Sequence, residues 1–308
     1  MAGLATAATA LAATLLAACG SPPGEQDGRL KVVAALYPLQ FVAERVGGDR
    51  VAVTSLAPPG AEPHDLELKP SQIASIADAD LVIYLPGFQP EVDAVVDLEG
   101  AGKALDAGAE VNLGASGSDH GTTDHGADQH GVDDHGGVDP HFWLDPTRLA
   151  VLAEGLAGRL SELDPDGATG YRERAADLRA SLEALDREYA ERLKTCARRE
   201  IVASHAAFGH LAQRYHLEQI AISGRAPEGE PTPAQVAAVV TAARDHGATT
   251  IFFETLVSPD VAEAIAREVG AETAVLDPVE GPPAAGEGDY FAVMRANLAA
   301  LTTALGCQ

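Results

Sequence analysis

The stretch from residue 30 to residue 65, LKVVAALYPLQFVAERVGGDRVAVTSLAPPGAEPHD, decides the fold class. Its apolar runs Leu30–Leu36 and Val51–Leu56 have the length and residue types of buried strands. Between them, the apolar residues of Leu39–Val46 follow a helical spacing. A buried strand, a helix and a second buried strand in this order indicate a parallel α/β architecture.

The same alternation of strand and helix patterns continues along the chain. The sequence predicts further strands at Leu81–Leu85, Ile201–Ser204, Gln219–Ile222, Thr250–Phe253 and Thr273–Leu276. It predicts further helices at Ser71–Ala77, Pro90–Val96, Ala206–Tyr215, Pro233–Asp245, Pro259–Val269 and Tyr290–Leu305. We therefore expect one α/β unit at 29–165 and a second at 197–308, which agrees with a length of 308 residues.

One long amphipathic pattern separates the two halves. Its apolar residues recur at steps of three and four: Tyr171, Ala175, Leu178, Leu182, Leu185, Tyr189 and Leu193. The pattern predicts a helix over Gly167–Thr195, about 43 Å long at 1.5 Å per residue. We expect segment 166–196 to be a rigid strut between the two units.

The charge of the chain excludes one large class of function. Lys and Arg number 21 against 46 Asp and Glu, which gives a formal net charge of −25. No basic stripe is available to neutralise phosphates, so we do not expect binding to nucleic acid. Adsorption to an anionic membrane is disfavoured as well, and covalent anchoring is the remaining route to a membrane.

The first residues have the composition of an export signal. Residues 1–18 are apolar, uncharged and too short to span a bilayer, which is typical of a signal peptide. They end in Leu-Ala-Ala before Cys19, which resembles a bacterial lipobox, with cleavage before Cys19 and a lipid on its thiol. Residues 19–28 would then be the lipidated Cys and a flexible tether. We expect an exported protein, anchored by lipid on the outer face of the cytoplasmic membrane or periplasmic; an apolar tail with an incidental cysteine is the alternative.

The remaining cysteines are Cys196 and Cys307. A pair of cysteines in an exported protein indicates a disulfide, and two buried thiols are the alternative.

Segment 114–138 has no pattern of helix or strand. It consists mostly of Gly, Asp and His, and four histidines recur every five residues: His120, His125, His130 and His135. Such a composition predicts a disordered loop that captures zinc weakly. A low-complexity insertion without a role is the alternative.

Three of the candidate metal ligands follow predicted strands. His64, His205 and Asp277 each come shortly after a strand, and parallel α/β sheets bind ligands beyond the carboxyl ends of their strands. His141 lies in another proline-flanked segment, DPHFWLDP at 139–146. Three imidazoles and a carboxylate would fill a tetrahedral Zn²⁺ shell. Each histidine taken alone is as well explained as a partly buried, hydrogen-bonded side chain.

Four motifs together carry a family resemblance. They are GAEPHD at 60–65, DPHFWLDP at 139–146, SHAAFG at 204–209 and LDP at 276–278. In this order and spacing they resemble the zinc/manganese solute-binding proteins of ABC importers, the ZnuA-like group, over about residues 30–307. The resemblance implies two α/β lobes joined by one long rigid helix, with metal in the cleft between them. It also implies that His64, His141, His205 and Asp277 are the ligands.

Two further acidic residues are candidates for a role at the site. Glu62 precedes His64 by two residues and is either an alternative ligand or a partner of a ligand. Glu254 ends a predicted strand and resembles a family position near the metal. Solvated surface acids are the alternative for both.

The resemblance implies a function in transport and not an enzyme. Manganese-selective members carry a carboxylate at the third ligand position, so His205 and the histidine-rich loop favour Zn²⁺ over Mn²⁺. We expect a monomer that captures Zn²⁺ outside the cell and delivers it to an ABC-type permease with its ATPase. The alternatives are a manganese-uptake protein and a zinc hydrolase, which the closing fourth ligand disfavours.

Overall fold

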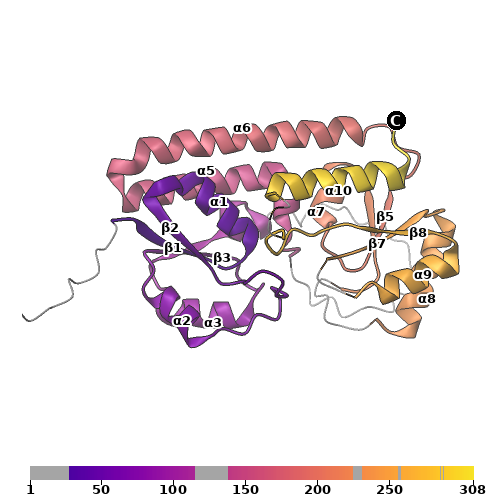
Figure 1. The fold of residues 1–308 in the computed structure, drawn as a ribbon, viewed down its shortest axis with the longest axis horizontal. Coiled ribbons are helices and arrows are strands. Elements are labelled where there is room, and N and C mark those ends of the chain that lie inside the picture. Colours follow the sequence, from indigo (N-terminus) through magenta and orange to yellow (C-terminus); the bar gives the residue numbers. More distant parts are fainter. Residues whose placement is uncertain (1–27, 115–137, 225–230, 256–257, 285, 287) are drawn as a thin grey trace, which may run out of the picture.

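A computed structural model describes residues 28–114, 138–224, 231–255, 258–284, 286 and 288–308. Within these residues the strands form two four-stranded sheets, one in each half of the chain, and paired strands are parallel. Figure 1 shows the two lobes side by side with one long helix running along both. The predicted fold class of two parallel α/β lobes joined by a long helix is confirmed.

The first sheet has the strand order β2-β1-β3-β4. Its strands are β1 (Leu30–Ala34), β2 (Val51–Ser55), β3 (Leu81–Tyr84) and β4 (Ala104–Asp106). Its helices are α1 (Tyr37–Gly47), α2 (Pro70–Ala77), α3 (Pro90–Glu99), α4 (Ala107–Glu110) and α5 (Pro146–Leu163). In Figure 1, α1 and α5 lie on one side of this sheet and α2 and α3 on the other. The sequence predicts all of these strands except β4, whose three residues are too few to show a pattern.

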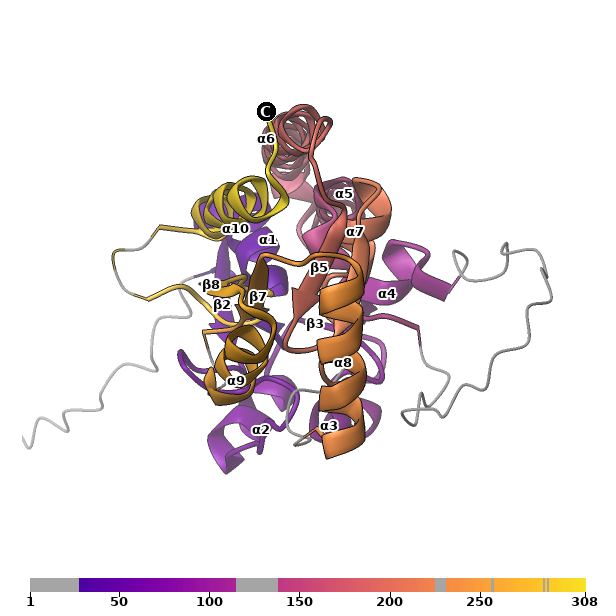
Figure 2. The ribbon, with the colours of Figure 1, turned by 90° about the vertical axis from the view of Figure 1, so that its right-hand side faces the viewer.

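The second sheet repeats the arrangement with the order β6-β5-β7-β8. Its strands are β5 (Glu200–Ala203), β6 (Glu218–Ala221), β7 (Thr250–Phe253) and β8 (Glu272–Val275). Its helices are α7 (Gly209–Arg214), α8 (Pro233–Asp245), α9 (Asp260–Val269) and α10 (Tyr290–Leu305). Figure 2, which looks at this lobe from its end, shows α8 and α9 below the sheet and α10 above it. The predicted bounds agree with these to within three residues.

Helix α6 (Ala168–Arg192) is anchored to both lobes. At one end, Arg174 donates hydrogen bonds to the carbonyl oxygens of Val46 and Gly47, at 2.7 and 2.9 Å. At the other end, the Tyr189 hydroxyl donates to the carbonyl oxygen of Met294 at 2.5 Å. The apolar stripe predicted from the sequence is the buried face of the helix. Because buried side chains and hydrogen bonds fix both ends, α6 restrains the relative movement of the lobes.

Helix α5 is the one long element among the described residues that the sequence analysis did not predict. It packs along α6, and its buried residues include Leu149, Leu152 and Leu156. Its start is nevertheless encoded locally, because the Asp145 carboxylate accepts the Thr147 N–H at 2.9 Å and Pro146 occupies the first turn.

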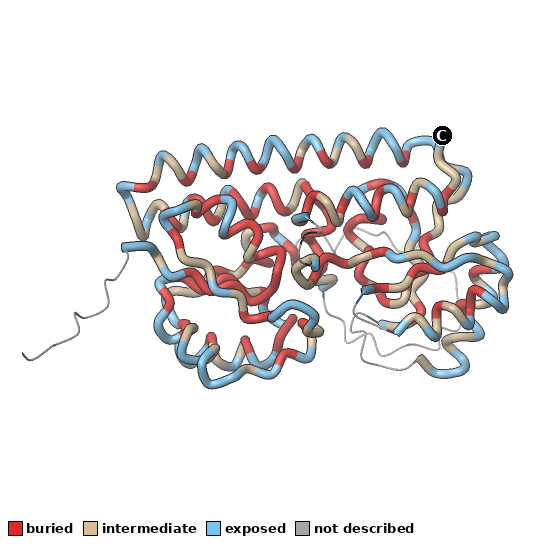
Figure 3. The backbone as a smooth tube through the Cα atoms, viewed as in Figure 1, coloured by how far each residue is buried: buried red, intermediate tan, exposed pale blue. Residues whose placement is uncertain are grey.

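The hydrophobic core crosses from one lobe to the other. One cluster of buried side chains contains Val33 and Leu81 of the first sheet, Leu182 of α6, and Phe208 and Tyr290 of the second half. A smaller cluster lies between β7, α8 and α9. Figure 3 shows buried residues continuing through the junction below α6. Since burial of apolar surface is the main force that stabilises folded chains, the shared core holds the lobes in one arrangement.

Several predicted features lie outside the described residues. They are the signal segment 1–18 with Cys19, and the loop histidines His120, His125, His130 and His135. Within the part of the chain that the structure describes, none of the helices has the length and apolar character needed to cross a membrane.

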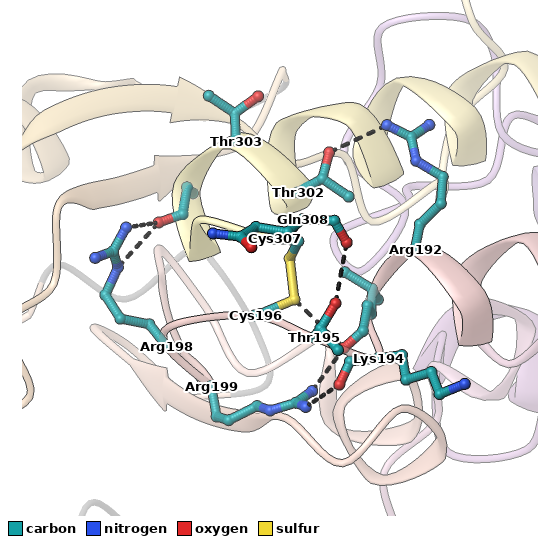
Figure 4. Close-up of a disulfide and its surroundings, with 12 residues drawn as sticks. Arg192, Lys194, Thr195, Cys196, Arg198, Arg199, Thr302, Thr303, Cys307 and Gln308 are labelled. Atoms are coloured by element: carbon teal, nitrogen blue, oxygen red, sulfur yellow. Dashed lines mark hydrogen bonds between the residues drawn. A yellow bond between two sulfur atoms is a disulfide. The ribbon is translucent and has the colours of Figure 1, made fainter.

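A disulfide joins Cys196, just after α6, to Cys307, just after α10. The segments that carry the two cysteines pair as an antiparallel bridge. Figure 4 shows two arginines near it: Arg198 donates to the carbonyl oxygen of Ala304, and Arg199 donates to that of Leu193. These bonds satisfy carbonyl oxygens at the ends of α10 and α6 and fix the C-terminus against the strut.

Replacing both Cys196 and Cys307 by alanine removes a link between residues 111 positions apart. We expect the free energy of unfolding to fall by about 2–5 kcal/mol, because the unfolded chain gains conformational freedom. Unfolding of the metal-free protein in guanidinium chloride measures this change. Wild-type protein under reducing conditions is the control and should unfold at the same lower midpoint. An unchanged midpoint in the double variant would contradict the prediction.

Candidate metal centre

His64 lies in the loop between β2 and α2. The buried side chain of Gln89, at the start of α3, holds this loop by donating to the carbonyl oxygens of Pro63 at 3.0 Å and Ala35 at 3.3 Å. The ring of Phe88 covers the His64 imidazole, with 4.3 Å between ring centroids. Backbone anchoring and an aromatic neighbour therefore fix the position of this histidine.

His141 precedes the short 3-10 helix η3 (Phe142–Leu144) and is fully buried. Its Nδ1 lies 2.8 Å from Asp139 Oδ1, and its backbone N–H donates to the same oxygen at 3.1 Å. His210 Nε2 lies 2.9 Å from the carbonyl oxygen of Asp139. A carboxylate at Nδ1 fixes the orientation of the imidazole and leaves Nε2 as the free nitrogen.

His205 comes two residues after β5 and is also fully buried. Its Nδ1 lies 2.5 Å from Glu254 Oε1, and Glu254 directly follows the neighbouring strand β7. Ser204 Oγ also donates to this oxygen, and Gln219 Nε2 donates to the His205 carbonyl oxygen at 2.9 Å. The end of β7 thus orients the histidine at the end of β5, leaving Nε2 free as in His141.

Glu280 brings a carboxylate to these three histidines. Its Oε1 lies 2.9 Å from His141 Nε2, 3.4 Å from His64 Nε2 and 3.5 Å from His205 Nε2. One ligand atom from each of the four residues lies within 4.8 Å of the others. All four atoms are buried, and none has a hydrogen bond of good geometry among the described residues. Buried polar atoms normally make well-formed hydrogen bonds, so four that converge on one another without one indicate a site for a cation.

Asp277, which the sequence analysis predicts as the fourth ligand, lies outside this cluster. Its Oδ1 accepts the backbone N–H of Val279 at 2.7 Å, and the Thr255 hydroxyl donates to its Oδ2 at 3.1 Å. The chain then turns at Val279, which has a φ of 59°, and Glu280 takes the place in the cluster that the sequence assigned to Asp277. The expectation that ligands lie just beyond the ends of strands pointed to Asp277, the first acidic residue after β8. The turn at Val279 instead brings the second, Glu280, to the histidines.

The two candidate partners of the ligands differ in position. Glu254 contacts His205 directly, as described above. Glu62 Oε1 accepts the backbone N–H of His64 at 3.3 Å and is not one of the four clustered residues. Asp139 is a partner that the sequence analysis did not single out, although it stands two residues before His141 in the DPHFWLDP motif.

The charges of the site are strongly coupled. Burial acts to raise the pKa of Glu280, but His141, His205 and His64 outweigh it and hold the pKa well below its ordinary value. Burial acts to lower the pKa of His205, but the carboxylates of Glu254 and Glu280 outweigh it and raise the pKa to about 10. The pKa of His141 is raised as well, because Asp139 and Glu280 outweigh burial. The Glu280 carboxylate is therefore ionised at neutral pH, and the raised pKa values of the two histidines favour protons on rings that a cation would contact.

The donor set suits zinc. Three imidazole nitrogens and one carboxylate oxygen make up a four-coordinate shell of the kind that holds Zn²⁺ tetrahedrally. A site for Mn²⁺ is expected to be richer in oxygen ligands. With four protein ligands in reach, the arrangement is closed, whereas catalytic zinc keeps one position open for water or substrate.

Comparison with known proteins agrees with this geometry. Residues 32–304 match the family model ZnuA, described as "Zinc-uptake complex component A periplasmic". The high-affinity zinc uptake system protein ZnuA of Bacillus subtilis is 35% identical over 301 residues, and the match covers 94% of each chain. The zinc-binding lipoprotein AdcA of Streptococcus pneumoniae is 33% identical over 94% of this chain, which spans 58% of AdcA.

The same fold is found among solved structures. The laminin-binding protein Lbp of Streptococcus pyogenes superimposes with a TM-score of 0.76 at 29% identity, covering 90% of this chain and 100% of that one. The resemblance inferred from the four motifs is confirmed by these matches, which extend over nearly the whole of both lobes. The chain belongs to the ZnuA family of zinc-uptake proteins.

Proposed function

We propose that this protein captures Zn²⁺ outside the cytoplasm at His64, His141, His205 and Glu280 and delivers it to an ABC-type permease. The observation that carries the proposal is the convergence of four buried atoms, none of which makes a hydrogen bond of good geometry among the described residues. The relatives that match most of the chain are named for zinc uptake and zinc binding. Zinc is the cargo of the protein, held for delivery and then released.

Selectivity for zinc over manganese follows from the ligand types. Imidazole nitrogen is a good ligand for Zn²⁺, while Mn²⁺ prefers oxygen. Only one of the four clustered residues supplies oxygen. Asp139 and Glu254 contact His141 and His205 at Nδ1, and this raises the basicity of the ligating nitrogens.

The family is one of uptake components, so the zinc hydrolase considered from the sequence is excluded as the function. The site agrees, because Glu280 occupies the position that a catalytic zinc would reserve for water.

Release of zinc to a permease requires movement near the site. The shared core and the anchored helix α6 restrain rigid opening of the lobes. We therefore infer that local movement of the loops that carry the ligands releases the metal. Crystal structures of metal-free and zinc-loaded protein test this, and a large rigid-body separation of the lobes would refute it.

The place of action rests on the N-terminal segment together with the family. The family description names a periplasmic component, and AdcA is named a lipoprotein. We infer that the chain is exported and held at the outer face of the membrane through a lipid on Cys19, with the permease and its ATPase as partners.

Glu280→Gln tests the proposed ligand set. The neutral amide is a weak ligand, so we expect the affinity for Zn²⁺ to fall by at least about 100-fold, more than the loss typical of a residue that only supports a ligand. Titration of chelator-stripped protein by competition with a chromophoric chelator measures the affinity. His64→Ala should have an effect of the same order. The control is His246→Ala, because His246 is exposed and pairs with Glu200 instead of the site. Zinc affinity unchanged in Glu280→Gln would refute this ligand set.

Binding of zinc should release protons. The pKa of His205, raised to about 10, favours a proton on this ring at neutral pH in the absence of metal, and the raised pKa of His141 acts in the same direction. Zinc must displace such protons, so the apparent affinity should rise between about pH 6 and 8 as competition by protons weakens. Calorimetry in buffers of different ionisation enthalpy counts the protons released. Glu254→Gln removes a cause of the raised pKa of His205 and should release fewer protons. A heat of binding that does not depend on the buffer would contradict the prediction.

Removal of residues 119–135 tests the contribution of the loop histidines. We expect the tight zinc site to remain, because the four clustered ligands lie outside this segment. Weaker additional binding should disappear with His120, His125, His130 and His135. Calorimetric stoichiometry before and after the deletion separates the two classes of site, and loss of the tight site with the loop would show that the buried cluster is not the main zinc site.

A further inference from the structure

The carboxylate of Glu280 reaches the histidines through an unusual turn. Strand β8 ends at Val275, and five residues later Glu280 lies buried among three imidazoles. Between them, Val279 has a φ of 59° and is fully buried. A β-branched residue in this left-handed region is a clear departure from ordinary backbone geometry. Such a conformation persists only where the surrounding structure enforces it.

Asp277 helps to hold Val279 in this left-handed conformation. Its Oδ1 accepts the Val279 N–H at 2.7 Å, which closes the turn over the intervening proline. Its Oδ2 accepts the hydroxyl of Thr255 at 3.1 Å. The carboxylate thus acts on the peptide immediately before Glu280.

Asn297 of α10 holds the other side of the same turn. Its Oδ1 accepts the backbone N–H of Asp277 at 2.9 Å, and its Nδ2 donates to the carbonyl oxygen of Asp277 at 2.7 Å. The side chain is 2% exposed, so both bonds are shielded from water. A buried amide that pairs with both backbone groups of one residue fixes the orientation of that residue.

The turn is also tied to the first lobe. Trp143 Nε1 donates to the carbonyl oxygen of Pro278 at 2.7 Å, and the Tyr37 N–H donates to that of Glu280 at 3.4 Å. The backbone around Glu280 is therefore held from α10, from the β7–α9 loop and from the first lobe.

We propose that Asp277 and Asn297 are positioning residues that hold the Val279 turn and thereby aim the Glu280 carboxylate at the three histidines. The inference rests on the proposed function, because it assigns these residues a role in zinc affinity. It also gives the LDP motif a purpose: its acid supports the ligand and does not bind the metal itself.

A pair of substitutions at Asp277 separates support from ligation. Asp277→Ala loses the acceptor for the Val279 N–H, and we expect zinc affinity to fall about 10–100-fold, the range typical of residues that orient a ligand. Asp277→Asn keeps an oxygen that accepts this N–H, so it should restore most of the affinity. Competition with a chromophoric chelator measures both. Asp260→Ala, an exposed acid at the start of α9, is the matched control.

The absorption spectrum of bound Co²⁺ provides a readout that general destabilisation does not change. In Asp277→Ala the d–d bands should shift, because the carboxylate of Glu280 is no longer fixed, and in Asp277→Asn they should match those of the wild type. Asn297→Ala should shift the bands in the same direction. Thermal unfolding of the metal-free variants establishes that each one folds; if Asn297→Ala does not, the Asp277 pair decides the question.

Two results would overturn the inference. If Asp277→Ala binds zinc and Co²⁺ as the wild type does, the turn needs no such support. If Asp277→Asn loses as much zinc affinity as Glu280→Gln, Asp277 is itself a ligand. Failure of the proposed function is distinct from both, since it would show as wild-type protein without a tight zinc site or as Glu280→Gln without effect.

Discussion

The structure depends on keeping four polar atoms together in a place that water does not reach. Three imidazole nitrogens and a carboxylate oxygen lie within 4.8 Å of one another, buried and without hydrogen bonds of good geometry. Burial of charged and polar groups costs free energy, and the contacts within the cluster are poorly aligned hydrogen bonds, so the cluster is unfavourable by itself. A bound cation removes that cost, whereas collapse of the cluster would remove the site. The fold therefore has to hold the four atoms in place in the absence of metal.

Both lobes contribute to holding the four atoms in place. The four clustered residues come from loops that follow β2, β5 and β8 and from the segment that enters η3, so neither lobe alone makes the cluster. Parallel sheets present such loops at the carboxyl ends of their strands, and here two sheets direct them at the same place. The shared core and α6 fix the position of the loops of one lobe relative to those of the other. Because the site is formed before the metal binds, little of the free energy of binding is lost in ordering the chain.

Sequence reasoning found most of the fold and three of the four clustered residues. Strands appear in the sequence as short apolar runs, and position at the ends of such runs made His64 and His205 candidates, which the family resemblance of the four motifs then selected as ligands. His141 was selected through its proline-flanked motif. Glu280 was missed because its approach depends on the φ of Val279 and on side chains distant in sequence, Asn297 and Trp143. Helix α5 was not predicted, although Asp145 as the N-cap and Pro146 in the first turn mark its start.

The four clustered residues are not equally enclosed, and this difference bears on how metal enters. The side chains of His141 and His205 are 0% exposed and that of Glu280 is 2% exposed, whereas that of His64 is 10% exposed. Carboxylates of Asp139 and Glu254 contact the rings of His141 and His205, while the loop of His64 is held through backbone bonds from Gln89. Within the described residues, the ligand nearest to solvent is thus the one whose ring lacks a buried carboxylate partner at Nδ1. The other three side chains are enclosed, so a cation that enters the cluster from solvent would approach from the side of His64.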